Sequence, residues 1–379
     1  MAAAGRNELL TSTSLRCTLF KKHKGPFQKS LAHRVVHISA TQLPAMPTTQ
    51  VFDLHRKGLS LSLPHLGEGG EGAVYRLKER PDVAIKLFNP EKIAKHGPQL
   101  REKLEVQIQL APHLKCLPLS WPLLSVFNNR HEWSGYAMRT VSGKPLTLLA
   151  NRQRIETHFP AFGRTHLVKV LISLLQTAHA LHQHSIMIGD VNLNNFLCDP
   201  NNGQVSLIDC DSYQVTTPDG RHFPCLVGSP NLTAPEHLGQ DFSRVQRTLA
   251  SDAFSLAILV FQCLMLGRHP YDCVGGSDPV KNMQSGHFPY GKGGSAPGFE
   301  GAIPAGPWYI IWSHLTFKLK DLMIHTFREG AGDPARRGTV SEWIGALQGY
   351  LWTLEKGHVS SDLVPKTPKT SNLNPSYSN

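Results

Sequence analysis

Three polar residues, Asp190, Asn195 and Asp209, have types and an order suited to handling phosphate together with a metal ion. Asp190 and Asn195 are five positions apart, and Asp209 follows fourteen positions after Asn195, behind a short apolar run. Phosphoryl transfer needs one carboxylate that orients the acceptor hydroxyl, and an amide and a carboxylate that hold magnesium against the phosphates. Acidic loop residues are common, but this order after an amphipathic segment is rarer. The segment therefore indicates phosphoryl-transfer chemistry.

A second segment, GEGGEGAVY, offers backbone groups to phosphates and follows the pattern G-x-G-x-x-G. Its residues of interest are Gly67, Glu68, Gly69, Gly70, Gly72 and Val74. Glycine lets a backbone N–H approach a phosphate without a Cβ in the way. The pattern alone is weak, because dinucleotide-binding folds use it as well, but those folds place a helix directly after the glycines. Here a second strand-like segment follows instead.

That following segment contains Ala84 and ends in the apolar run V-A-I-K at Lys86. A lysine at this place can reach back to nucleotide phosphates as a point charge. The alternative is an ordinary surface lysine at the end of a strand, and Lys86 by itself does not decide between the two.

Positioning these residues requires a strand-rich part followed by a helical part. Apolar periodicity and turn residues predict strand, turn and strand over 61–87, a helix over 99–110, two strands within 121–141, helices over 166–183, 252–266, 313–327 and 339–354, and a long Gly- and Pro-rich loop over 274–306. This order predicts an α+β fold with a small N-terminal lobe and a larger helical C-terminal lobe. The expected domains are a basic flexible extension (1–50), a core over 60–352 with lobes at about 60–141 and 142–352, and a disordered tail (353–379).

The composition limits the classes of function. The chain of 379 residues has a formal net charge of +11, but residues 1–50 alone hold seven basic residues and one acidic residue. The high net charge therefore belongs largely to the extension and is no argument for nucleic-acid binding. The extension resembles a transit peptide in composition, and the alternatives are a flexible extension or a functional start at Met46. Seven cysteines without metal-site spacing favour a reduced, cytoplasmic setting, and no apolar run is long enough to predict a membrane span.

Taken together, the motifs resemble the eukaryotic-type protein kinase superfamily over 60–352. The glycine pattern, V-A-I-K and the D-x4-N loop are joined by A-P-E at Ala234–Glu236 and by D-x-F-S-L at Asp252–Leu256. The chain looks most like a bacterial subgroup with G-D-x-N-x-x-N-F and I-D-x-D-S-[FY]-Q motifs. The resemblance implies a bilobal kinase fold and an ATP- and Mg²⁺-dependent (or Mn²⁺-dependent) transfer to a protein hydroxyl, of Ser/Thr type. It identifies neither the protein substrate nor the oligomeric state.

The resemblance also implies roles for individual residues. Asp190 and Lys86 would be catalytic, Asn195 and Asp209 would hold the metal, and the hinge register Met138–Val141, with Arg139 and Val141, would contact adenine. The expected carboxylate partner of Lys86 is Glu102, ten residues before Pro112, with Glu105 as the second choice. Arg337 would pair with Glu236, and Asp252 would support the structure.

Three departures from the family pattern affect the loop around Asp190. Ile188 and Gly189 replace the usual His-Arg pair, and Asn192 stands where a lysine is usual, so Asn192 is the candidate for the catalytic role of that lysine. Asp-Cys-Asp replaces Asp-Phe-Gly, and the additional carboxylate, Asp211, would assist metal binding or cap a turn. The core set is otherwise intact, which favours an active enzyme over a nucleotide-binding pseudokinase scaffold. The A-P-E segment argues against a small-molecule kinase.

Overall fold

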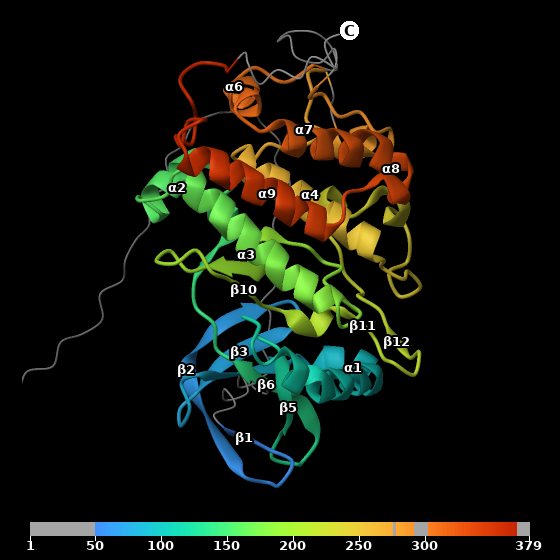
Figure 1. Cartoon of the computed structure of the whole chain (residues 1–379). Coiled ribbons are helices and arrows are strands. Elements are labelled where there is room, and N and C mark those ends of the chain that lie inside the picture. The colour runs from blue at the N-terminus through green and yellow to red at the C-terminus, as the bar shows by residue number, and fades with distance from the viewer. Residues whose placement is uncertain (1–49, 276–277, 292–301, 370–379) are drawn as a thin grey trace, which may run out of the picture. The chain divides into compact units, whose positions relative to one another are not determined.

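The computed structural model describes residues 50–275, 278–291 and 302–369, and its N-terminal part is an antiparallel sheet that closes into a barrel (Figure 1). The strands are β1 (Gln50–Phe52), β2 (Gly58–Gly69), β3 (Gly72–Leu77), β4 (Val83–Phe88), β5 (Pro122–Phe127) and β6 (Trp133–Arg139). Their order is β1-β2-β3-β4-β6-β5, and the pairing of Phe52 with Phe127 closes the barrel.

Side-chain alternation along the strands gives the sheet two apolar faces, because successive residues of a strand point to opposite sides. One buried cluster includes Leu61, Ile85 and Ala137. The other includes Met138 and also Leu104, which comes from helix α1 (Pro90–Leu110). Helix α1 therefore covers the second face of the sheet.

Helix α1 is longer than the sequence predicted, since it begins at Pro90 and not at 99. Proline suits the first helical position, where the missing N–H would have no partner in the helix. Pro98 lies inside the helix on its exposed side, so the ring points away from the sheet while Gly97 is buried. The prediction was wrong here because a proline within a helical pattern usually ends the helix.

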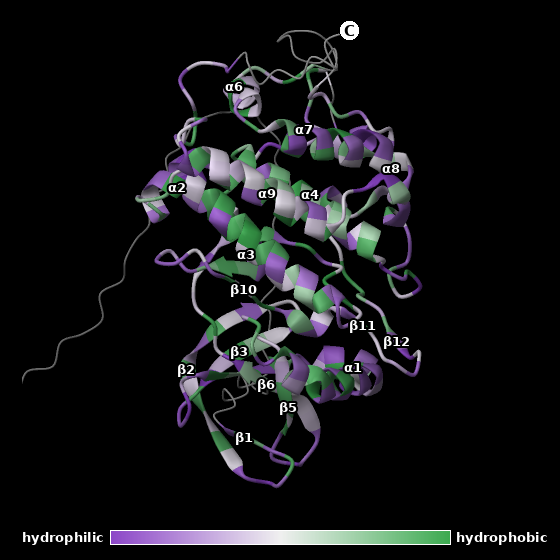
Figure 2. Cartoon of the chain, viewed as in Figure 1, coloured by the Kyte–Doolittle hydropathy of each residue, from purple (hydrophilic) through white to green (hydrophobic). Residues whose placement is uncertain are grey.

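The C-terminal part is mainly helical, which confirms the predicted α+β fold with two lobes. Its α-helices are α2 (Arg152–His158), α3 (Arg164–His182), α4 (Leu249–Leu264), α5 (Pro279–Gln284), α6 (Trp308–Ser313), α7 (Phe317–Ile324), α8 (Gly330–Gly332) and α9 (Val340–Glu355). Apolar positions, green in Figure 2, recur along α3, and most of the buried residues of this helix are apolar.

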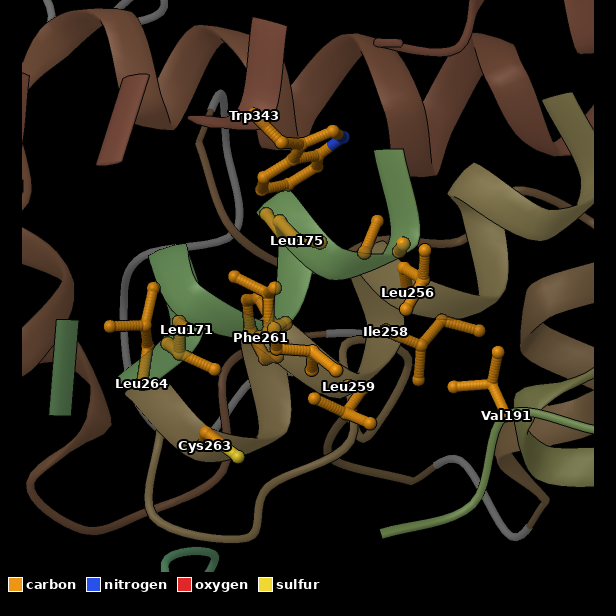
Figure 3. Close-up of a cluster of buried hydrophobic side chains, with 14 of the residues drawn as sticks. Leu171, Leu175, Val191, Leu256, Ile258, Leu259, Phe261, Cys263, Leu264 and Trp343 are labelled. Carbon is orange, nitrogen blue, oxygen red and sulfur yellow. The ribbon is translucent and has the colours of Figure 1, made fainter. Parts of the chain in front are cut away.

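Helix α4 is the centre of this lobe and is buried almost along its whole length. Its side chains, among them Leu256 and Phe261, belong to one buried cluster with Leu171 and Leu175 of α3 and with Trp343 of α9, which lies next to Leu175 (Figure 3). An apolar helix of this length that is buried all round is typical of a protein interior. The prediction of a buried helix over 252–266 is confirmed.

Short strands form two small sheets, and all of them except β7 lie between α3 and α4 in the sequence. One contains β7 (Lys144–Pro145), β9 (Phe196–Cys198) and β10 (Val205–Leu207), and the other contains β8 (Ile186–Met187), β11 (Gln214–Thr216) and β12 (His222–Phe223). In the first sheet Phe196 pairs with Leu207, so β9 and β10 form an antiparallel hairpin. These sheets fix the loops that hold the polar residues.

The boundaries of the ordered core differ from the prediction at both ends. Strand β1 extends the folded part to residue 50, and residues 1–49 of the predicted extension lie outside the described residues. The predicted disordered tail is wrong for 353–369. The guanidinium of Arg164, which is fully buried, donates to the carbonyl oxygens of Asp362 and Leu363, and Val359 joins the apolar core.

The predicted loop over 274–306 is interrupted by helix α5, which the side chain of Asp278 caps by accepting from the N–H of Val280. Residues 276–277 and 292–301 of this loop lie outside the described residues. Among the described residues, no helix is long and apolar enough to cross a membrane.

Candidate active site

The hairpin of β9 and β10 brings Asn195 and Asp209 to one place. Asn195 ends the 3₁₀ turn Leu193–Asn195 directly before β9, and Asp209 follows two residues after β10. The N–H of Ile208 donates to the carbonyl oxygen of Asn195 over 2.9 Å and extends the ladder by one pair. An amide and a carboxylate, fourteen residues apart in sequence, therefore lie at the same end of one hairpin.

Asp252 at the start of α4 holds the loop that carries Asp190. Its carboxylate, which is almost completely buried, accepts from the backbone N–H groups of Ile188 (2.9 Å) and Gly189 (2.8 Å) and contacts Nε2 of His182 (2.8 Å). Hydrogen bonds to a carboxylate are stronger than those between neutral groups. Asp252 therefore fixes the backbone just before Asp190, in agreement with the structural role expected for it.

Gly189 has a structural reason to be glycine. Its φ is +72°, in the left-handed region, and a Cβ there would lie 2.6 Å from Cβ of Cys225. The side chain of Cys225 therefore occupies the space next to the position where the family has an arginine.

Asp190 itself is partly exposed and contacts Oγ of Ser229 at 3.5 Å. Burial raises the pKa of Asp190 above its ordinary value, and the hydroxyl of Ser229 and the charge of Arg247 oppose this rise without cancelling it. A carboxylate with a raised pKa is a better proton acceptor than a carboxylate with the ordinary pKa.

The side chain of Asn192 shapes the turn next to Asp190. Its Oδ1 accepts from the N–H of Asn194 over 3.0 Å and caps the short 3₁₀ turn. This contact gives Asn192 a structural role. A catalytic role for Asn192 stays a prediction, and the site lacks the positive charge of the usual lysine at this position.

The glycine turn between β2 and β3 faces open space. A Cβ placed on Gly67, Gly69 or Gly70 would meet no protein atom within 4 Å, whereas a Cβ on Gly72 would lie 2.0 Å from the carbonyl oxygen of Leu87. Of these four positions, packing within the chain therefore requires glycine only at Gly72. The open space at the first three positions fits a ligand that approaches the backbone, as a phosphate does. Val74, next to this turn, pairs with Lys86 in the sheet.

Lys86 lies in β4 and points toward the end of the β9–β10 hairpin. Its Nζ is 3.3 Å from Oδ1 of Asp209 and 2.9 Å from each carboxylate oxygen of Asp211. Burial alone would lower the pKa of Lys86, but the charges of Asp211 and Asp209 outweigh burial and hold it above its ordinary value. Lys86 is therefore a cation, buried between two carboxylates.

The prediction that Glu102 holds Lys86 was wrong. The side chain of Glu102 is 59% exposed and lies 3.8 Å from Arg221, while the second choice, Glu105, accepts from Oγ of Ser125. One residue along a helix turns the side chain by about 100°, and the inward position belongs to Lys103. The register estimated from Pro112 was one residue out.

The prediction that Asp211 caps a turn was also wrong. This carboxylate is 3% exposed and accepts from Lys86 and from the hydroxyl of Tyr136 at 2.7 Å, and no side chain that the structure describes caps the turn Cys210–Ser212. Help in metal binding stays a prediction. Burial alone would raise the pKa of Asp211, but Lys86 holds it below the ordinary value. Burial raises the pKa of the Tyr136 hydroxyl, which keeps it a donor.

The hinge register lies at the end of β6. Ala84 and Met138 are cross-strand partners with buried side chains, at the position expected to border adenine. The side chain of Arg139 is exposed, and its backbone carbonyl accepts from Oγ of Ser120. Within the described residues, no backbone hydrogen bond uses the N–H of Val141, so this donor is free for a ligand.

Farther from the site, Arg337 binds Glu236 through two hydrogen bonds, of 2.7 and 2.6 Å. This is the contact expected from the sequence. It joins the segment before α9 to the A-P-E segment, and the Arg337 guanidinium also lies over the ring of Phe254.

The donor set fits a divalent metal bound jointly with phosphate. In the described part of the chain no group of three or more His, Cys, Asp or Glu side chains could hold a metal ion. Asn195 and the partly exposed Asp209 together offer an amide and a carboxylate. Magnesium is usually held by one or two protein ligands together with substrate phosphates and water, so these two side chains suffice.

Sequence reasoning missed three residues of the site: Lys103, Gln107 and Tyr136. Nζ of Lys103 donates to the carbonyl oxygens of Ser212 and Pro224, and Nε2 of Gln107 donates to that of Cys210. The signal was present in the sequence, because polar residues four apart on the apolar face of a helix lie on the same side.

The amino-acid sequence of the chain is similar to those of known protein kinases. The protein kinase domain model matches residues 61–293. The chain is 29% identical over 303 residues to protein kinase YegI of Escherichia coli strain K12, a match that covers 78% of this chain and 45% of that protein. It is also 29% identical over 211 residues to serine/threonine-protein kinase PLK4 of Drosophila willistoni, covering 55% of this chain and 25% of that protein. The chain thus spans less than half the length of these relatives. Because the domain model covers more than half of it, the chain belongs to the protein kinase family.

Proposed function

We propose that this chain transfers the γ-phosphate of ATP to a Ser or Thr hydroxyl of a protein, with magnesium as the metal. One observation carries the proposal: Lys86 of β4 contacts Asp209, and the β9–β10 hairpin brings Asp209 to the same end as Asn195, in the loop that also carries Asp190. The Ser/Thr type is supported by a relative that is named a serine/threonine-protein kinase. The cytoplasmic location inferred from the cysteine pattern stays a prediction.

The proposed chemistry assigns each group a task. The carboxylate of Asp190 accepts the proton of the acceptor hydroxyl, and its raised pKa helps it do so. Lys86 contacts the phosphates of ATP, and the open glycine turn gives them backbone N–H groups. Asn195 and Asp209 would hold the metal, which neutralises charge on the phosphates when bound.

A phosphate-transfer assay tests this proposal. Purified chain, ATP and magnesium should label either the chain itself or a generic protein substrate. Asp190→Ala should abolish transfer, because the hydroxyl loses its proton acceptor, but should preserve nucleotide binding measured by thermal shift. Absence of transfer by the wild type with magnesium and with manganese would reject the proposal.

A nucleotide-binding scaffold without turnover is the second candidate. The observation that favours it is the side chain of Asn192, which caps a turn where the family has a lysine. Thermal stabilisation by ATP without any phosphate transfer would select this candidate over the first.

A further inference from the structure

The ammonium group of Lys86 has its closest contacts with Asp211. This residue belongs to the metal segment (209–212), which also contains the candidate metal ligand Asp209. Both oxygens of Asp211 lie 2.9 Å from Nζ, while Asp209 offers one oxygen at 3.3 Å. The hydroxyl of Tyr136, the sheet partner of Lys86, donates to the same carboxylate over 2.7 Å. The side chain of Asp211 is thus restrained from two neighbouring strands.

Helix α1 offers Lys86 no carboxylate. Its buried polar residues are Lys103 and Gln107, and both donate to backbone carbonyl oxygens, including those of Cys210 and Ser212 on either side of Asp211. Helix α1 therefore holds the backbone of residues 210–212 in place, whereas the side chain of Asp211 in this segment forms the ion pair with Lys86.

We propose that Asp211 is the positioning residue for Lys86, and that the lysine is set by the metal segment and not by helix α1. The inference rests on the proposed function for its meaning in catalysis, because Lys86 is the group that would contact ATP. Asp211 replaces a carboxylate that the sequence pattern assigned to α1.

The same turn carries both the partner of Lys86 and the candidate metal ligand Asp209. Asp209 and Asp211 lie in one 3₁₀ turn, in which the N–H and the hydroxyl of Ser212 both donate to the carbonyl oxygen of Asp209. A displacement of α1 would break the hydrogen bonds of Lys103 and Gln107 but would leave the carboxylate of Asp211 on Lys86. A change in this turn would displace the lysine and the metal ligand together.

Chemical labelling of Lys86 tests the proposal without depending on phosphate transfer. Reductive methylation of the full chain at pH 8, followed by mass spectrometry, reports the fraction of Lys86 present as free amine. Asp211→Asn removes the neutralising charge from a buried lysine, so we expect methylation of Lys86 at least about tenfold faster, which is one pKa unit. Glu102→Gln should leave the rate within about twofold of wild type, because this exposed side chain does not contact Lys86.

Tyr136→Phe provides a second variant in case Asp211→Asn does not fold. It removes one donor from Asp211 but keeps the ion pair, so methylation should rise by about two- to threefold. Equal rates in wild type and in both the Asp211 and Tyr136 variants would overturn the proposal. A rise in Glu102→Gln as large as in Asp211→Asn would also overturn it, because helix α1 would then control the lysine.

Kinetics separate this inference from the proposed function. If the wild type transfers phosphate, Asp211→Asn should lower kcat/KM by about 100-fold, because one partner of a buried pair is left uncompensated. Glu102→Gln should keep the wild-type value, and an equal loss in both variants would count against Asp211. If the wild type transfers no phosphate, the proposed function fails, while the labelling rates still decide whether Asp211 positions Lys86.

Discussion

Replacing Arg337 by methionine should strongly destabilise the folded chain. The guanidinium makes two hydrogen bonds to Glu236 and one to the carbonyl oxygen of Gly330 at 2.6 Å, and the arginine side chain is 1% exposed. Methionine keeps the apolar stem but removes the charge and all of these donors. The carboxylate of Glu236, with 31% of its side chain exposed, then loses its partner.

The expected cost lies at the lower end of the range for a broken buried ion pair, about 3 kcal/mol, because Glu236 retains some contact with water. For a folded part of this size that corresponds to a fall in Tm of about 4 to 5 °C. The neighbouring Arg336 is a matched control, since its side chain is 64% exposed and contacts Glu329 at 3.5 Å. Arg336→Met should cost no more than about 1 kcal/mol.

Thermal unfolding followed by circular dichroism, at one scan rate for all variants, measures the difference. Burial alone would raise the pKa of Glu236, but Arg337 holds it below the ordinary value. A lowered folded-state pKa gives stability that is present at neutral pH and is lost as the pH falls through that pKa. The Tm gap between wild type and Arg337→Met should therefore narrow in acid. A Tm for Arg337→Met within 2 °C of that for Arg336→Met, or a gap that widens in acid, would refute this reasoning.

Three further predictions follow from the site and its surroundings. Because burial raises the pKa of Asp190, the acid limb of the kcat/KM profile should lie above pH 3.8, with activity lost as the pH falls. The hydroxyl of Ser229 lowers this pKa, so Ser229→Ala should move the acid limb to higher pH. A movement to lower pH would contradict the assignment of Asp190 as the base. Gly189→Ala should cost at least about 1 kcal/mol more in a urea titration than Gly220→Ala, since both have positive φ but only Gly189 faces a close neighbour; equal costs would show that backbone conformation alone matters. Arg164→Met should make residues 356–369 susceptible to limited proteolysis, because the buried guanidinium holds their backbone; an unchanged digestion pattern would show that apolar packing is sufficient.

Local patterns in the sequence predicted the elements of the fold well. The strands around V-A-I-K and the helix over 252–266 depend on neighbours a few residues apart, which the sequence displays directly. Two boundaries were predicted less accurately. The start of α1 was placed too late because Pro98 lies inside the helix, and the C-terminal end of the folded part was placed too early because the distant Arg164 binds the backbone there.

Local patterns were enough to single out Lys86, Asp190, Asn195 and Asp209 as candidates, because the glycine turn, the D-x4-N loop and the Asp209 segment are each recognisable from neighbouring residues. The partner of Lys86 became visible only in the folded chain. Asp211 lies 125 positions away from it in sequence, and one residue of helical rotation turned Glu102 to solvent and Lys103 inward. An ion pair between distant segments depends on where the backbones pack, and no spacing within a single segment records that.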